Sequence, residues 1–66
     1  MLTEQEIMNN AFKEMQFHED SMAKKYACMS DEINDPKIKQ MLKGMEQGSR
    51  NNFKTLSETM SKFSIV

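Results

Sequence analysis

The sequence predicts an all-α fold, an antiparallel hairpin of two helices, from three observations. The 66 residues include only two glycines and one proline, so few positions interrupt a helix. Apolar residues recur at steps of three and four, the spacing of one helix face. A single break signal, Asn34-Asp35-Pro36, stands near the middle, because proline disfavours the α region for the residue before it. Residues 1–66 are therefore predicted to form one helical domain.

The first helix is predicted to span about residues 3–33. Thr3, followed three residues later by Glu6, forms a capping-box pattern at its start. Methionines then recur every seven residues, a spacing that keeps them on one face, at Met1, Met8, Met15, Met22 and Met29. A second set follows the last four of these by four residues each, at Phe12, Glu19, Tyr26 and Ile33.

The second helix is predicted to span about residues 36–62. Asp35 can cap its start, and Pro36 suits its first turn. A connection this short makes the helices antiparallel and places residue i opposite roughly residue 71 − i. The end of the chain, Ser61–Val66, is expected to fray, with Phe63 close enough to join the core.

The apolar residues of both helices are expected to form one stripe that serves as core and as interface. Methionine suits this role because its flexible thioether chain fills irregular gaps. Two other readings stay open: a Cu(I) site of Met15, His18 and Met22, because thioethers suit soft metals, and a flexible surface for varied partner helices. The stripe consists of Met8, Phe12, Met15, Met22, Tyr26, Met29, Ile38, Leu42, Met45, Phe53, Leu56 and Met60.

A lone hairpin of this length is expected to be marginally stable. Burial of one large apolar side chain contributes about 1.5–3 kcal/mol, whereas ordering one residue costs about 1.5 kcal/mol. Two hairpins in a four-helix bundle would bury both stripes, and a twofold homodimer is the commonest closed assembly. We therefore expect the chain to form a homodimeric four-helix bundle. The two halves also carry opposite net charge, −5 over residues 1–35 and +4 over residues 36–66, which favours contacts between unlike helices.

A polar layer of Glu19, Ser49 and Arg50 is expected to interrupt the stripe. The register places Glu19 opposite residues 48–52, and a carboxylate at a core position needs a partner. We expect either an ion pair between Glu19 and Arg50 or a hydrated site at the open end of the contact. Two other readings are a polar device that fixes the register of the dimer and a metal ligand.

Gly44 and Gly48 lie inside the predicted second helix, where each glycine costs about 1 kcal/mol relative to alanine. One reading is a close approach of the facing helix, in which Met22 or Tyr26 needs the space. The other reading is a kink in the second helix.

Composition and charge argue against several classes of function. A formal net charge of −1 gives no electrostatic basis for binding nucleic acid. No apolar run approaches the roughly 20 residues of a membrane span, and the N-terminus lacks signal-peptide features. Cys28 is the only cysteine, so no disulfide forms within one chain, and we expect a cytoplasmic location. Neither His18 nor Cys28 belongs to a catalytic constellation, so we expect no enzyme.

Glu19-x6-Tyr26 on a first helix, followed by a glutamate on an antiparallel second helix, resembles half of a ferritin-like bundle. In that architecture a first-helix glutamate and a Glu-x-x-His motif supply iron ligands. The matching segment here is Glu46-Gln47-Gly48-Ser49, with serine in place of histidine. The resemblance implies, as an alternative function, metal binding at a degenerate carboxylate site of Glu19, Glu46 and His18. We expect no cofactor, because carboxylates without imidazole match di-iron chemistry poorly.

The chain also resembles the small spore coat F-like helical hairpins of sporulating bacteria. The resemblance lies in two segments, Leu2-Thr3-Glu4-Gln5-Glu6-Ile7-Met8-Asn9-Asn10 and Asn34-Asp35-Pro36-Lys37-Ile38-Lys39-Gln40-Met41-Leu42, and extends to Glu46 and Phe53. The aromatic C-terminal ending of the typical coat F pattern is missing. The resemblance implies a non-enzymatic assembly protein, a spore-associated location and other helical spore proteins as further partners.

Overall fold

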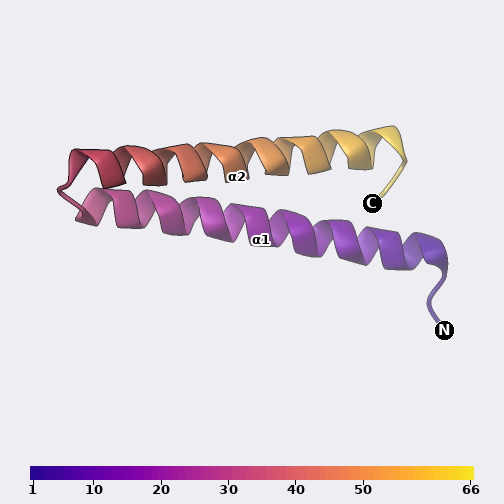
Figure 1. The fold of residues 1–66 in the computed structure, drawn as a ribbon. Coiled ribbons are helices and arrows are strands. Elements are labelled where there is room, and N and C mark those ends of the chain that lie inside the picture. The colour runs from indigo at the N-terminus through magenta and orange to yellow at the C-terminus, as the bar shows by residue number, and fades with distance from the viewer.

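The computed structural model describes all 66 residues and contains two helices and no strand. Helix α1 spans Glu4–Glu32, and helix α2 spans Pro36–Lys62. The two helices lie side by side and run in opposite directions, joined by residues 33–35 at one end of the molecule (Figure 1). This architecture confirms the predicted all-helical hairpin, and the observed bounds lie within one residue of the predicted ones.

A complete capping box starts α1. The backbone N–H of Glu6 donates to the Thr3 hydroxyl at 3.1 Å, and the Glu6 carboxylate accepts from the Thr3 backbone N–H at 3.0 Å. Both bonds satisfy amide groups that the first turn of a helix leaves without partners. The Thr3 backbone N–H, and to a lesser degree the Thr3 side chain, stabilise the charged carboxylate and hold the pKa of the Glu6 carboxyl below its ordinary value of 4.5. The predicted capping box is therefore confirmed.

Asp35 caps α2 from the turn between the helices. Its side-chain oxygen Oδ1 accepts from the backbone N–H groups of Lys37 at 2.9 Å and Ile38 at 3.0 Å. Pro36 occupies the first turn of the helix, where its missing N–H leaves no bond unmade. The predicted break and cap are confirmed at this turn.

Lys39 ties the two helices together next to the turn. Its ammonium group donates to the backbone carbonyl of Ser30 at 2.6 Å. Helix α1 has no basic residue in its own last turn, where the helix dipole favours positive charge. Lys39 supplies that charge from α2, so this bond both caps α1 and joins the two helices next to the turn.

The C-terminal end is ordered in a way that differs from the expected fraying. Ser64 has a positive φ of 54°, and the N–H of Ile65 donates to the carbonyl of Met60 at 2.8 Å. This 6→1 bond across a left-handed residue is the bond that closes a helix in the Schellman motif. Ile65 is only 6% exposed, whereas Phe63 is 64% exposed. The expectation that Phe63 joins the core is therefore wrong, and Ile65 takes that place.

The residues after α2 also contact the start of α1. The backbone N–H of Val66 donates to the side-chain oxygen of Asn9 at 3.1 Å, and the Gln5 amide donates to the Ser64 carbonyl at 3.4 Å. Figure 1 shows the C-terminal end turned back from α2 toward α1. These contacts close the end of the hairpin opposite the turn.

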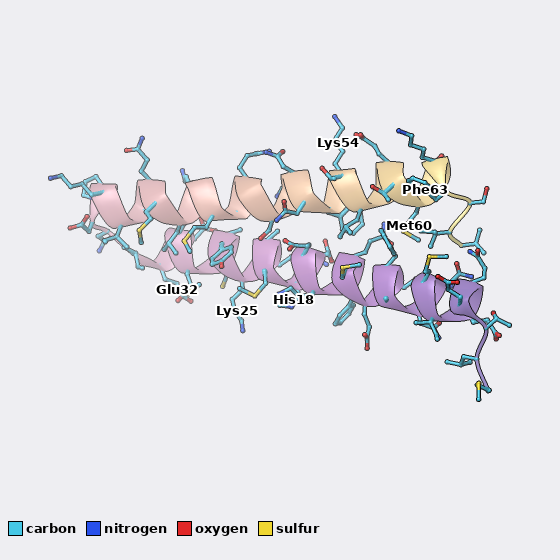
Figure 2. All side chains as sticks on the ribbon, turned by 45° about the vertical axis from the view of Figure 1, so that its right-hand side comes forward. His18, Lys25, Glu32, Lys54, Met60 and Phe63 are labelled. Carbon is cyan, nitrogen blue, oxygen red and sulfur yellow. The ribbon has the colours of Figure 1, made fainter.

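The line of contact between the helices, which we call the seam, has mostly small residues at its most buried positions. Its most buried members are Ala23 and Ser30 on α1 and Leu42 and Ser49 on α2, seven residues apart on each helix. Small side chains let two helix backbones lie close together. Long charged side chains such as Lys25 and Lys54 point away from the facing helix (Figure 2).

Two hydrogen bonds across the seam give the register of the helices. The Gln16 amide donates to the Ser57 hydroxyl at 2.9 Å, and the Asn52 amide donates to the Glu19 carboxylate at 3.4 Å. The predicted pairing of residue i with roughly residue 71 − i places Glu19 opposite Asn52. The register is therefore confirmed.

The hairpin forms a single flat layer. Its Cα atoms extend over 49 × 22 × 11 Å, and only five of the 66 residues are buried. A compact monomer of this mass is expected to expose about 4,300 Å² and to have a radius of gyration of about 11 Å. The observed values are 5129 Å² and 15.1 Å. One chain therefore lacks the second layer that encloses a hydrophobic core in most domains.

Candidate interaction surface

The methionines of α1 lie beside the seam and not at its centre. Met22 directly precedes Ala23 in the chain, so its side chain is turned from the seam by about 100°. The same offset holds for Met8, Met15 and Met29 relative to the residue that follows each of them. Met15 is exposed, and the other three are half-buried. We expected these methionines to pack against the second helix, and the structure gives that place to smaller residues.

Helix α2 has an equivalent row of residues beside the seam. Met41 directly precedes Leu42, and Met45 lies three positions after it, so both are turned from the seam in the same sense as Met22. Met41 is 53% exposed and Met45 is 44% exposed. Two antiparallel helices are related by a twofold axis perpendicular to their common plane. Residues with the same offset therefore lie on the same side of the hairpin.

These two rows form one surface, which we call the open face. Its residues are Met8, Ala11, Met15, Met22 and Met29 of α1 and Met41, Met45, Gly48, Asn52 and Thr55 of α2. Ile38 and Phe53 of the predicted stripe are also exposed, although they lie nearer the seam. Leu56, Met60, Phe12 and Tyr26 are half-buried along it.

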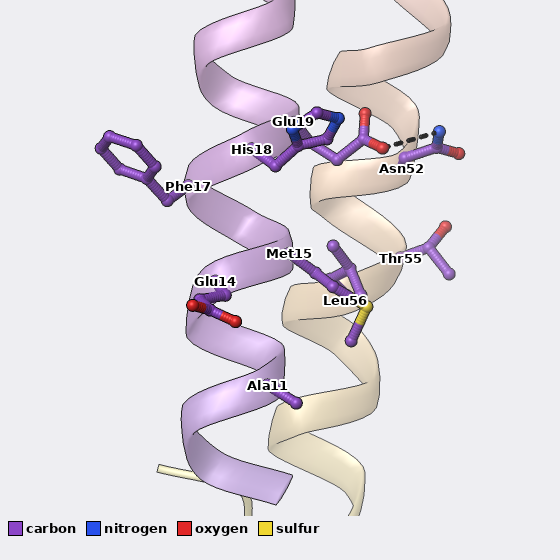
Figure 3. A pocket seen from close by; sticks show the side chains of 9 residues that line it. All are labelled: Ala11, Glu14, Met15, Phe17, His18, Glu19, Asn52, Thr55 and Leu56. Carbon is purple, nitrogen blue, oxygen red and sulfur yellow. Dashed lines mark hydrogen bonds between the residues drawn. The ribbon is translucent and has the colours of Figure 1, made fainter.

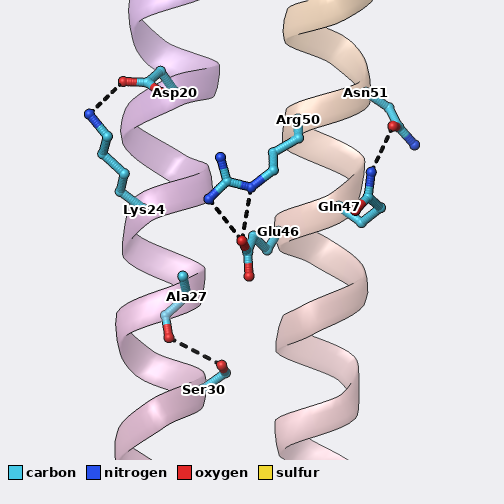
Figure 4. Close-up of polar contacts among 8 residues, drawn as sticks. All are labelled: Asp20, Lys24, Ala27, Ser30, Glu46, Gln47, Arg50 and Asn51. Atoms are coloured by element: carbon cyan, nitrogen blue, oxygen red, sulfur yellow. Dashed lines mark hydrogen bonds and ion pairs between the residues drawn. The ribbon is translucent and has the colours of Figure 1, made fainter.

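The opposite side of the hairpin, which we call the charged face, carries the ion pairs. Lys24 contacts Asp20 at 2.9 Å, and Arg50 contacts Glu46 at 2.8 Å, each pair within one helix (Figure 4). Helix α1 is on the left in both Figure 3 and Figure 4. Its residue numbers rise upward in Figure 3 and downward in Figure 4, which is possible only if the two figures view the hairpin from opposite faces. The hairpin is thus an amphipathic layer with one face rich in methionine and one face rich in charge.

A shallow groove crosses the middle of the open face (Figure 3). Met15 and Leu56 point toward each other in it, and the bond between Glu19 and Asn52 lies at one end. Its volume of about 730 Å³ is in the range of small-molecule sites, but such sites bury most of their ligand. This groove has only two helices as walls and is open to solvent above, so it belongs to the face and not to an enclosed pocket.

The predicted polar layer is only partly assembled. Arg50 donates to Glu46 from both Nε and Nη2 at 2.8 Å, so the expected ion pair between Glu19 and Arg50 is wrong. Glu19 instead accepts the 3.4 Å bond from Asn52, which is long for a hydrogen bond to a carboxylate. Ser49 is buried in the seam. Sequence reasoning missed Asn52, although the predicted register already placed residues 48–52 opposite Glu19.

The structure does not gather the predicted metal ligands. No group of three or more histidine, cysteine, aspartate or glutamate side chains lies close enough together to hold a metal ion. Glu46 is engaged by Arg50, and His18 lies in the groove beside Glu19. Within one chain, Glu19, Glu46 and His18 therefore do not form the degenerate carboxylate site. Met15 and His18 line the groove, whereas Met22 is not among its residues.

The two glycines of α2 do not accommodate the facing helix. A Cβ atom placed at Gly44 or at Gly48 would meet no atom within 4 Å, so neither Met22 nor Tyr26 approaches them closely. The expected close approach within the hairpin is therefore wrong. Helix α2 also continues without a break through both positions. Gly48 lies on the open face and Gly44 at its outer edge, so both glycines leave space on the outside of the hairpin.

No protein-family model, curated protein or solved structure that we compared with the chain matches it. Neither helix has a stretch long and apolar enough to cross a membrane.

Proposed function

We propose that this chain is a non-enzymatic interaction module that self-associates through its open face into a homodimeric four-helix bundle. The single observation that carries this proposal is the flat, one-layer shape of the hairpin with methionines along one side. Stacking of two such layers, open face on open face, encloses a core between them. The charged faces then form the two outer surfaces of the bundle.

The exposed area supports an interface of ordinary size. The chain exposes about 800 Å² more than a compact monomer of its mass, and a standard interface buries about 800 Å² on each partner. A hairpin face of 49 × 22 Å has room for such a contact. Chains of this length often gain stability from disulfides, metals or association, and one exposed cysteine forms no disulfide within the chain.

The mass of the protein in solution tests the proposal. We expect multi-angle light scattering to give about twice the 7.7 kDa of one chain in metal-free buffer. The mass and the helical circular dichroism signal should fall together on dilution, because association and folding are coupled. A monomer that keeps its full helical signal at a concentration of about 100 μM would overturn the proposal.

The resemblance to spore coat F-like hairpins suggests where such a dimer acts. It supports an assembly role in a spore, with other helical proteins as further partners on the charged faces. The capped ends of the helices, at Thr3 and Asp35, belong to the two segments that carry the resemblance. We expect an antibody against the chain to detect it in purified spores of the source organism. Detection only in extracts of growing cells would contradict this role.

A further inference from the structure

We propose that the two hairpins of the dimer stack with their twofold axis parallel to the helices, so that α1 of each copy lies on α2 of the other. This inference rests on the proposed function, which supplies the second copy. It adds which helix of one copy lies on which helix of the other copy, and which residues face each other there.

Two symmetric stackings of flat hairpins exist. When two layers meet face to face, the twofold axis lies in the plane between them, along the helices or across them. An axis across the helices places α1 on α1 and α2 on α2. An axis along the helices places α1 on α2 at both contacts. All neighbouring helices are antiparallel in either arrangement, so the direction of the helices does not decide between them.

The charge of the helices decides between the two arrangements. Helix α1 has three lysines against seven acidic residues, a net charge of −4, whereas α2 has six basic residues against two acidic ones, a net charge of +4. The axis across the helices would bring two helices of charge −4 together and two of charge +4 together. Contact between like-charged surfaces is unfavourable, and complementary charge sets orientation. The axis along the helices makes every contact one between unlike helices.

The same symmetry fixes the register between copies. A twofold axis parallel to the helices leaves the height of each residue along the bundle unchanged. Residue i of α1 therefore meets roughly residue 71 − i of the partner, as it does within one chain. Met22 then lies over Gly48 and Ser49 of the other copy, where a Cβ at the glycine meets no atom of its own chain. The open space at Gly48 is thus where this arrangement places a methionine.

Disulfide trapping tests the arrangement. Two chains are prepared in a Cys28→Ser background, one with His18→Cys and one with Thr55→Cys. These positions lie on different helices at the groove of the open face (Figure 3). The chains are mixed in denaturant, refolded together and oxidised, and the cross-linked species are identified by mass spectrometry. Each chain has one cysteine, so every disulfide joins two chains. We expect the mixed species to exceed its statistical share, because the register places residue 18 near residues 53–55 of the partner.

The opposite arrangement gives a different product. If the axis runs across the helices and the two faces overlap fully, it passes near residue 18, the midpoint of α1. Residue 18 of one chain then lies close to residue 18 of the other, so two His18→Cys chains would link to each other. An excess of that product, or a purely statistical mixture, would overturn the inference. The control pair, Lys24→Cys with Gln47→Cys, has the same register but lies on the charged face and should cross-link no more than by chance (Figure 4). A dimeric mass with self-linked His18→Cys rejects only the arrangement, whereas a folded monomer rejects the proposed function as well.

Discussion

Met45→Glu is expected to convert the dimer into separate chains, with self-association weakened at least about 100-fold. Burial of one methionine contributes about 1.5–3 kcal/mol, and the symmetry of a dimer removes two of them at once. The sum, about 3–6 kcal/mol, corresponds to a factor of roughly 100 or more in the dissociation constant. Burying two new carboxylates adds to this loss, because an unpaired charge is costly to remove from water. Sedimentation equilibrium over a range of concentrations measures the change.

Gln47→Glu is the matched control for this substitution. It introduces the same residue two positions later in α2, and Gln47 is exposed on the charged side of the hairpin. Its amide makes one exposed bond, to Asn51 at 2.9 Å, and the substitution changes little in shape (Figure 4). We expect Gln47→Glu to keep the mass of the parent protein. Equal weakening by both substitutions would show that added negative charge, and not the open face, is responsible.

The parts of the fold that depend on local chemistry could be predicted from the sequence. Thr3 and Glu6 satisfy each other's backbone at the start of α1, and Asp35 satisfies the first amides of α2. Such bonds involve residues close in the chain, so a short pattern identifies them. The register follows from a short connection, which gives antiparallel helices little freedom to slide. The bond between Asn52 and Glu19 agrees with it.

The position of the seam could not be predicted from hydrophobicity alone. Two series of residues with the same spacing of seven stand side by side on α1, one containing Met22 and the other Ala23. Apolar size favours the first series as the core, but small residues allow two helices to pack closely, and the structure places Ala23 at the seam. A hairpin that contacts its own second helix along the seam and a second copy through the open face has two such series, one for each contact. A single periodicity does not say which surface each series covers.

The end of α2 and the partner of Glu19 were missed for other reasons. Ser64 adopts a left-handed conformation without the glycine or asparagine that usually signals it, so Ile65 was not recognised as a buried residue. Arg50 and Asn52 are both opposite Glu19 in the register. Arg50 has an acidic neighbour one turn earlier in its own helix, and that local pair prevails over the contact across the seam.

Leu42→Ala is expected to lower the free energy of unfolding by about 2–4 kcal/mol, the second of the two largest effects. Leu42 is 7% exposed and is the largest side chain that either helix buries in the seam. Replacing a buried leucine by alanine loses its burial and leaves a cavity. A domain of this length has a total stability of roughly 3–10 kcal/mol, so a large part of the protein would unfold. Urea denaturation followed by circular dichroism, at one fixed chain concentration, measures the loss.

Met41→Ala separates the seam from the open face. Met41 is the neighbour of Leu42 in the chain but is 53% exposed within the hairpin. In the Met45→Glu background no partner covers the open face, so the hairpin is kept folded with the osmolyte trimethylamine oxide. There we expect Met41→Ala to cost less than about 1 kcal/mol and Leu42→Ala to keep its full effect. In the parent protein, Met41→Ala should also weaken association, because methionine then loses contacts with the second copy. Equal costs of the two substitutions in the Met45→Glu background would mean that Met41 packs within its own chain, and the open face would then be smaller than the structure shows.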